Sequence, residues 1–171
     1  NLNFTNFELM ENFSLYKRAG LNSIHYFYTQ QTLGNYKIFP LCIGRGCPVN
    51  CSFCGGAKLS QRLINNRRTM VFRSPEKTLG SIKDAVKAGY EEIFINLDPC
   101  FNRGYFGALS RLIRKSKIDI RMNFASCSLP PKDFIDEFKR TFKNGSTIHV
   151  SPETGSERLR RLNKPLFYKS L

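Results

Sequence analysis

The sequence predicts an α/β fold, in which helices cover a parallel sheet. Two observations carry this prediction: strand-like apolar runs alternate with amphipathic helical stretches, and every connection is long enough for a crossover helix. Size agrees, because 171 residues with 41% hydrophobic content can form one ordinary core. In such folds a ligand binds at the carboxyl ends of the strands.

A strand and a capped helix form the first predicted unit. Residues 37–43 are rich in β-forming side chains, and Gly44-Arg45-Gly46 is expected to end this strand. Ser74-Pro75-Glu76 predicts a helix start, because Ser caps free N–H groups, Pro suits the first helical position and Glu complements the positive helix end. Gly89 is placed to end the helix in the left-handed conformation, and residues 92–97 form the second strand.

The rest of the chain repeats this alternation. We expect helices over residues 105–116, from Pro130-Pro131 to Gly145 and near 155–163, and strands over 118–124 and 146–150. Because each helix joins two strands, the strands run parallel and the loops after them form the candidate ligand site.

The first residues follow no such pattern. Residues 1–36 show no sustained period of 3.6 or 2, so we interpret them as a lead-in segment, with the functional core over residues 37–171. The chain begins with Asn1 rather than Met and ends soon after a basic helical stretch. We therefore expect it to be part of a longer polypeptide.

The charge is strongly basic. The chain has 27 Lys and Arg residues against 13 Asp and Glu residues, a formal net charge of +14. This excess suits nucleic acid, another polyanion or an acidic partner domain, and charge alone does not choose between them. No apolar run reaches the roughly 18 residues that span a membrane, and no signal peptide is evident. We expect a cytoplasmic protein without a membrane partner.

Three cysteines lie close together in the loop after the first strand. Cys47, Cys51 and Cys54 fall within eight residues, and such thiolates bind metal more readily than they form disulfides in a reducing compartment. Structural zinc is disfavoured, because it needs four closed ligands, while His25 and His149 each stand alone. A four-cysteine cluster would need Cys42, Cys100 or Cys127 as its fourth ligand. Three cysteines without an obvious fourth favour a cluster with one open iron.

The sequence Gly46-Cys47-Pro48-Val49-Asn50-Cys51-Ser52-Phe53-Cys54 resembles the signature loop of the radical S-adenosylmethionine (radical SAM) enzymes. The resemblance implies that the three cysteines hold a 4Fe-4S cluster whose open iron is chelated by SAM, with the Phe53 backbone against the adenine. The reduced cluster would then cleave SAM to a 5'-deoxyadenosyl radical. It also implies a partial (βα) TIM-like barrel, truncated after strand four of the six expected.

Two further segments resemble the cobalamin-dependent and methylthiolating branch of that family. They are Arg73-Ser74-Pro75-Glu76 and Ser151-Pro152-Glu153-Thr154-Gly155-Ser156-Glu157-Arg158, the second with Asn163-Lys164 further on. The resemblance implies that Glu153 and Ser156 contact SAM. Where many members have Gly-Gly-Glu after strand two, this chain has Asn96-Leu97-Asp98-Pro99, so Asp98 is the candidate acceptor for the methionine amino group.

Several of these residues also have simpler interpretations. Glu153 can complement the positive end of the following helix, and Asp98 can be a turn residue beside Pro99. We expect both histidines to serve packing or hydrogen bonding and Cys42 to lie in the strand core. Cys100 and Cys127 follow strands two and three and can face the site, but we assign them no function, and no residue is assigned to catalysis.

The principal hypothesis is the core of a radical SAM enzyme. The alternative is a non-catalytic iron–sulfur electron-transfer module, and a zinc-dependent nucleic-acid-binding domain is a third class. The expected partners are the rest of the polypeptide, with the missing strands and flanking domains, and a reductant such as flavodoxin or ferredoxin. The sequence also leaves open whether a cobalamin-binding domain lies upstream and whether the substrate is a nucleic acid such as transfer RNA. We expect residues 1–171 alone to be a poor enzyme.

Overall fold

A four-stranded parallel sheet forms the centre of the molecule. The computed structural model describes residues 5–16 and 38–164. Within them the strand order is β1-β4-β5-β6, formed by Ile38–Pro40, Glu92–Ile95, Arg121–Ser126 and Thr147–Val150, and every pairing is parallel. The predicted α/β fold is confirmed, and it is consistent with part of a TIM-like barrel.

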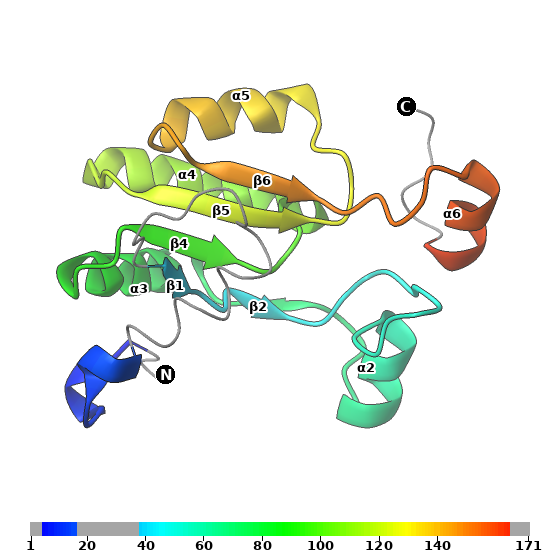
Figure 1. Ribbon diagram of the computed structural model, residues 1–171, viewed down its shortest axis with the longest axis horizontal. Helices are drawn as coiled ribbons and strands as arrows, with labels where there is room; N and C mark the ends of the chain where they lie inside the picture. Colours follow the sequence, from blue (N-terminus) through cyan, green and yellow to red (C-terminus); the bar gives the residue numbers. More distant parts are fainter. Residues whose placement is uncertain (1–4, 17–37, 165–171) are drawn as a thin grey trace.

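Three helices cover one face of this sheet (Figure 1). They are α3 (Pro75–Lys87), α4 (Arg103–Ser116) and α5 (Lys132–Thr141). Their apolar stripes meet the strands in one buried cluster, where Phe124 of β5 contacts the rings of Phe106, Phe134, Phe138 and Phe142. The aromatic packing fixes the sheet and therefore the loops at its carboxyl end.

The caps predicted from the sequence are present at α3. The Ser74 hydroxyl accepts a hydrogen bond from the Lys77 N–H at 3.2 Å, and Pro75 is the first helical residue. Gly89 follows the helix with φ +80°, a left-handed conformation that favours glycine. The Asn102 side chain caps α4 in the same way, through the Tyr105 N–H at 3.0 Å.

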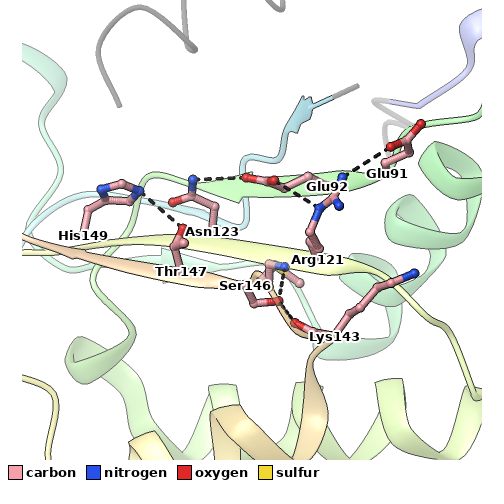
Figure 2. A network of polar contacts seen from close by, with 9 residues as sticks. Glu91, Glu92, Arg121, Asn123, Lys143, Ser146, Thr147 and His149 are labelled. Carbon is pink, nitrogen blue, oxygen red and sulfur yellow. Dashed lines mark hydrogen bonds and ion pairs between the residues drawn. The ribbon is translucent and has the colours of Figure 1, made fainter. Parts of the chain in front are cut away.

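The opposite face of the sheet carries a polar network at the amino ends of the strands (Figure 2). Ile93 and Met122 point into the helix-covered core, so Glu92, Arg121 and Asn123 point the other way. Glu92 accepts a hydrogen bond from the Asn123 side chain at 3.1 Å and lies 3.5 Å from Arg121 Nε. This network links β4 to β5 far from the cysteine loop.

Several boundaries differ from the sequence-based prediction. Gly44–Arg45 does not end a strand but forms β2, which pairs antiparallel with β3 (Val71–Phe72). The helix α2 (Lys58–Asn65) was not predicted, because it is short and begins after Ala57, which offers no capping side chain. Helix α5 ends at Thr141 rather than at Gly145, which instead occupies the turn before β6 with φ +91°.

The predicted lead-in segment lies mostly outside the described residues, as does His25. Its described part, residues 5–16, packs against the core: the Phe7 ring contacts those of Phe39 and Tyr90, and Thr5 donates a hydrogen bond to Asp84 at 2.6 Å. Across the described residues, none of the helices has the length and apolar character to cross a membrane.

Candidate functional site

The cysteine loop lies at the carboxyl end of the sheet, between β2 and α2 (Figure 1). Val49 is 1% exposed and anchors the loop, while Cys47 and Cys51 are half-buried and Cys54 is exposed. The Val49 N–H lies 3.5 Å from Cys47 Sγ, and the Gly56 N–H lies 3.3 Å from Cys54 Sγ. The loop therefore directs backbone N–H groups at two of its sulfur atoms.

The start of α2 fixes the far side of this loop. The Lys58 N–H donates to the Val49 carbonyl at 2.8 Å, and the Leu59 N–H donates to the Asn50 side chain at 3.2 Å. The Ala57 N–H adds a bond to the Cys54 carbonyl at 3.1 Å. These bonds satisfy N–H groups that the first turn of a helix leaves free, and they couple α2 to the loop.

The segment after β6 contains a strained glutamate beside a buried lysine. Glu153 has φ +64°, a conformation that non-glycine residues adopt only at some cost. Lys164, at the end of α6 (Glu157–Asn163), is 3% exposed and donates from Nζ to Glu153 Oε1 at 2.9 Å and to the Ser151 carbonyl at 2.8 Å. This pairing holds the glutamate in place. The Ser156 hydroxyl caps α6 through the Leu159 N–H, at 3.4 Å.

The cysteine loop and the α6 segment contact each other directly. The Ser52 N–H donates to the Asn163 carbonyl at 3.0 Å, and the Ser52 hydroxyl donates to the Asn163 side chain at 2.5 Å. A shallow pocket of about 340 Å³ lies at this junction, and its lining consists of Phe53, Glu153, Thr154, Leu159 and Asn163. Two of the predicted cofactor residues, Phe53 and Glu153, therefore share one pocket.

Comparison with known families agrees with this geometry. The sequence profile of the radical SAM superfamily matches residues 41–169, which is most of the chain and includes both segments that form the pocket. The chain belongs to the radical SAM superfamily. A search of curated proteins found no match. Membership of this superfamily implies an enzyme that uses an iron–sulfur cluster and SAM.

The residues of the loop fit the cluster of a radical SAM protein. Within the described residues no three His, Cys, Asp or Glu side chains converge on a single ion. A cluster of several irons does not require such convergence, because each cysteine binds a different iron. In iron–sulfur proteins, cysteine thiolates bind the irons, and backbone N–H groups donate hydrogen bonds to the sulfur atoms. The loop offers both kinds of group.

Burial raises the pKa of the Cys47 and Cys51 thiols above its usual value. For both thiols the neighbouring cysteines raise the pKa further, while the positive charge of Lys164 lowers it. Both thiols are protonated at neutral pH in the chain without metal, because even the ordinary thiol pKa lies above 7. Binding of a cluster in this radical SAM protein would therefore release protons.

The structure places Asp98 beneath the site, with 2% exposure. Its carboxylate accepts from the N–H groups of Cys100 and Cys127 at 2.7 Å, from the Ser128 N–H at 3.0 Å and from the Ser128 hydroxyl at 2.9 Å. Asp98 thus joins the loop after β4 to the loop after β5. Its predicted contact with the methionine amino group stays a prediction. The bond to Cys100 agrees with the simpler interpretation of a turn residue beside Pro99, and the bonds to Cys127 and Ser128 show a positioning task that the sequence did not reveal.

The remaining cysteines differ in their surroundings. Burial raises the pKa of Cys100 and of Cys127 to about 11, so both are neutral thiols at pH 7. Cys127 is close enough to Cys47 and Cys51 for their charges to raise its pKa as well. Cys42 is exposed, so its predicted place in the strand core is wrong: β1 ends at Pro40, and Cys42 lies beyond it.

The structure confirms the role predicted for His149, which is packing or hydrogen bonding. Its Nε2 lies 3.4 Å from the Thr147 hydroxyl, in the polar network on the face of the sheet that the helices leave uncovered (Figure 2). Burial lowers the pKa of His149, and the charge of Glu92 opposes this by a smaller amount. The imidazole is therefore neutral at pH 7.

The sequence resemblance includes Asn163, Lys164 and Ser52 but predicts no role for them, and the structure shows that all three hold the site together. The signal for Lys164 was weak, because one Lys in a basic stretch is ordinarily a solvated residue. Its burial beside Glu153 becomes visible only when α6 folds back onto the cysteine loop.

Proposed function

We propose that this chain is the core of a radical SAM enzyme that binds a 4Fe-4S cluster through Cys47, Cys51 and Cys54 and binds SAM in the adjoining pocket. The observation that carries the proposal is the junction between the cysteine loop and α6. There, Phe53 and Glu153 line one pocket, and Phe53 belongs to the cysteine loop, between Cys51 and Cys54. When bound, the cluster supplies a low-potential electron that cleaves SAM to a 5'-deoxyadenosyl radical.

The chain's own residues bind and orient the cofactors. The Phe53 side chain is 58% exposed at the pocket and offers an apolar surface to the adenine. Glu153, held by Lys164, offers its carboxylate to hydroxyl or amino groups of SAM, and Ser156 lies three residues further on. Asp98 keeps the loops after β4 and β5 at a fixed separation under the thiols. These residues therefore hold the cofactors in a fixed orientation, which is what a reaction between them requires.

The finer features stay predictions. They are the cobalamin-dependent or methylthiolating branch, an upstream cobalamin-binding domain, the substrate and reaction, a cytoplasmic location, and the boundary between a lead-in segment and a core at residue 37. The remainder of the polypeptide is proposed as the partner that completes the barrel.

A specific observation favours one alternative. An iron–sulfur electron-transfer module needs a fourth protein ligand, and Cys127 lies near Cys47 and Cys51 on the same side of the sheet. In that case Cys127 closes the cluster and SAM has no iron to bind. The same cysteine is dispensable for cluster binding in the enzyme.

Electron paramagnetic resonance separates these two functions. The full-length protein is reconstituted anaerobically with iron and sulfide, reduced with dithionite and measured with and without SAM, with Cys51→Ala and Cys127→Ala in parallel. The enzyme predicts a cubane signal that shifts with SAM, disappears in Cys51→Ala and persists in Cys127→Ala. A signal that ignores SAM and disappears in Cys127→Ala establishes the carrier, and absence of any cluster in the unmodified protein refutes both.

A further inference from the structure

Helix α2 presents an unusual exposed face next to the cysteine loop. Leu59, Leu63 and Ile64 are 51%, 74% and 76% exposed, and α2 has no buried residue within the described structure. Leu59 and Leu63 are one helical turn apart, so their side chains lie on the same side. A cluster of large apolar side chains left in water is typical of a surface that another molecule covers.

Basic side chains accompany this apolar face. Lys58, Arg62 and Arg68 are exposed, and none has an acidic partner among the described residues. The sequence contains no Asp or Glu between Glu11 and Glu76, so neighbouring residues in the chain supply no counter-charge. We call these three basic residues, together with Leu59, Leu63 and Ile64, the α2 surface. An acidic molecule complements its charge.

The α2 surface is joined rigidly to the thiols. Three hydrogen bonds connect the start of α2 to the carbonyls of Val49 and Cys54 and to the Asn50 side chain. Cys54 is also the most exposed of the three cysteines of the loop. The pocket proposed for SAM is lined by the loop residue Phe53 and by residues of the α6 segment, and no residue of α2 lines it. Figure 1 shows α2 and α6 at the same end of the sheet.

We propose that the α2 surface is the docking site for an acidic one-electron carrier protein. This inference rests on the proposed function, because it assigns the route by which the cluster is reduced. The carrier gives up one electron, the cluster accepts it, and no bond forms or breaks. The eight residues of α2 span about 12 Å, a size suited to the small, transient interfaces of electron-transfer partners.

The apolar component favours a protein over a nucleic acid. Phosphate recognition uses Lys, Arg and polar groups, and single strands add aromatic stacking platforms. Helix α2 offers exposed Leu and Ile side chains and contains no aromatic residue. An apolar centre with a charged rim is the usual composition of a protein interface.

Two pairs of variants in the full-length protein test the proposal. Arg62→Glu with Arg68→Glu reverses the charge of the α2 surface, and Leu63→Ser with Ile64→Ser removes its apolar part. Lys115→Glu with Lys139→Glu is the charge control, because both residues are exposed on the helices behind the sheet. Leu15→Ser is the apolar control, since Leu15 is 57% exposed. Thermal unfolding verifies that each variant is folded.

Two readouts use an acidic flavodoxin as the probe. The first is its dissociation constant for the cluster-free protein at several salt concentrations. The second is the rate at which the reduced flavodoxin bleaches the reconstituted cluster, compared with dithionite, which needs no docking. We expect both α2 pairs to weaken binding and slow flavodoxin reduction about tenfold, with the dithionite rate and both controls unchanged. The charge reversal is also expected to remove most of the salt dependence.

Equal binding by the unmodified protein and both α2 pairs would overturn the proposal. So would binding of a single-stranded RNA that the charge reversal abolishes while flavodoxin binding is unchanged, because the surface would then serve nucleic acid. Failure of a thiol reagent to modify Leu63→Cys in the folded full-length protein, when it does modify the unfolded chain, would show that another part of the chain covers α2, which also overturns the proposal. Failure of the unmodified protein to assemble a cluster refutes the proposed function, while the cluster-free binding readout still tests the surface.

Discussion

The two ends of the sheet use polar residues in opposite ways. At the amino ends, Glu92, Arg121 and Asn123 contact one another across β4 and β5, and Glu92 is 8% exposed (Figure 2). At the carboxyl ends, thiols lie half-buried or exposed, and Glu153 has a left-handed backbone. The first end pairs its own charges, although Asn123 Oδ1 is buried without a hydrogen-bond partner among the described residues. The second end keeps thiols that a metal cluster can bind.

The difference shows where stability and function separate in this fold. Residues that pair internally contribute to the free energy of unfolding, since their removal leaves a buried partner unsatisfied. Residues kept for a ligand contribute little until the ligand binds, and strain such as that at Glu153 is typical of functional sites. The predictions below measure this separation as changes in the stability of the cluster-free protein. Asp98 is the exception, because it lies at the functional end and is expected to stabilise the fold.

Asp98→Asn is expected to destabilise the cluster-free protein by about 3 kcal/mol, although Asp98 lies at the functional end. Its two carboxylate oxygens both accept from backbone N–H groups, and an amide nitrogen cannot replace either oxygen. Urea unfolding at pH 7 measures the loss. Asp119→Asn is the matched control, because Asp119 is exposed and Lys143 is its one ion-pair partner in the described part of the chain. A loss below about 1 kcal/mol would show that Asp98 is free to act mainly on a ligand.

Glu92→Gln is expected to cost about 2 kcal/mol and to leave iron binding unchanged. The substitution removes the charge that faces Arg121 Nε at 3.5 Å, inside the described network. Glu91→Gln is its control: Glu91 bonds to the same arginine at 3.3 Å, but its side chain is 51% exposed. Unfolding in urea and the iron content after reconstitution give the two readouts. Reduced iron binding in Glu92→Gln would mean that the two ends are coupled.

His149 gives a smaller effect that depends on pH. Because burial lowers its pKa in the folded state, the unfolded chain takes up the proton first as the pH falls. His149 therefore favours unfolding progressively below its ordinary pKa of about 6.5, and the loss stops once the pH is below the lowered value. The effect is expected to be smaller than that of Glu92→Gln, since the ring is only partly buried. Urea titrations from pH 8 to 5 on His149→Gln should show a flatter profile than the unmodified protein, and identical profiles would contradict this account.

Much of this fold was readable from the sequence, because its signals are local. Ser74-Pro75-Glu76 and Gly89 mark both ends of α3, and the alternation of strands and helices indicates the parallel sheet. Helix α2 escaped prediction for a physical reason: it spans only eight residues, and its N-cap residue, Ala57, has no side chain that could cap it, so neither a long apolar period nor a start signal marks it. The β2–β3 pairing was missed because such short strands depend on partners distant in sequence.

The candidate site also combines residues that a local sequence pattern predicts with residues whose role depends on distant segments. The spacing of Cys47, Cys51 and Cys54 is a local pattern, and it led to the family that the comparison shows. The contacts of Asp98 and Lys164 join segments that are distant along the chain, for example Asp98 with Ser128 and Lys164 with Glu153. Nothing near either residue in the sequence marks its partner, so only the folded chain reveals that both hold loops in place.

Cys54→Ala is expected to change the stability of the cluster-free protein least of all, by no more than about 0.5 kcal/mol. The Cys54 side chain is exposed, and its one described contact is an acceptor role toward the Gly56 N–H, which water can replace. The same substitution should reduce bound iron to background after reconstitution, because a cluster ligand is lost. Urea unfolding of the cluster-free chain and iron analysis of the reconstituted chain measure the two quantities on one preparation.

Cys42→Ala is the matched control, since Cys42 is also exposed but lies outside the loop, and it should retain iron. A large loss of stability in Cys54→Ala would assign the thiol a structural task, and retained iron would remove Cys54 from the proposed ligand set. Full loss of iron with almost no loss of stability would show that Cys54, at the carboxyl end of the sheet, serves a ligand rather than the fold.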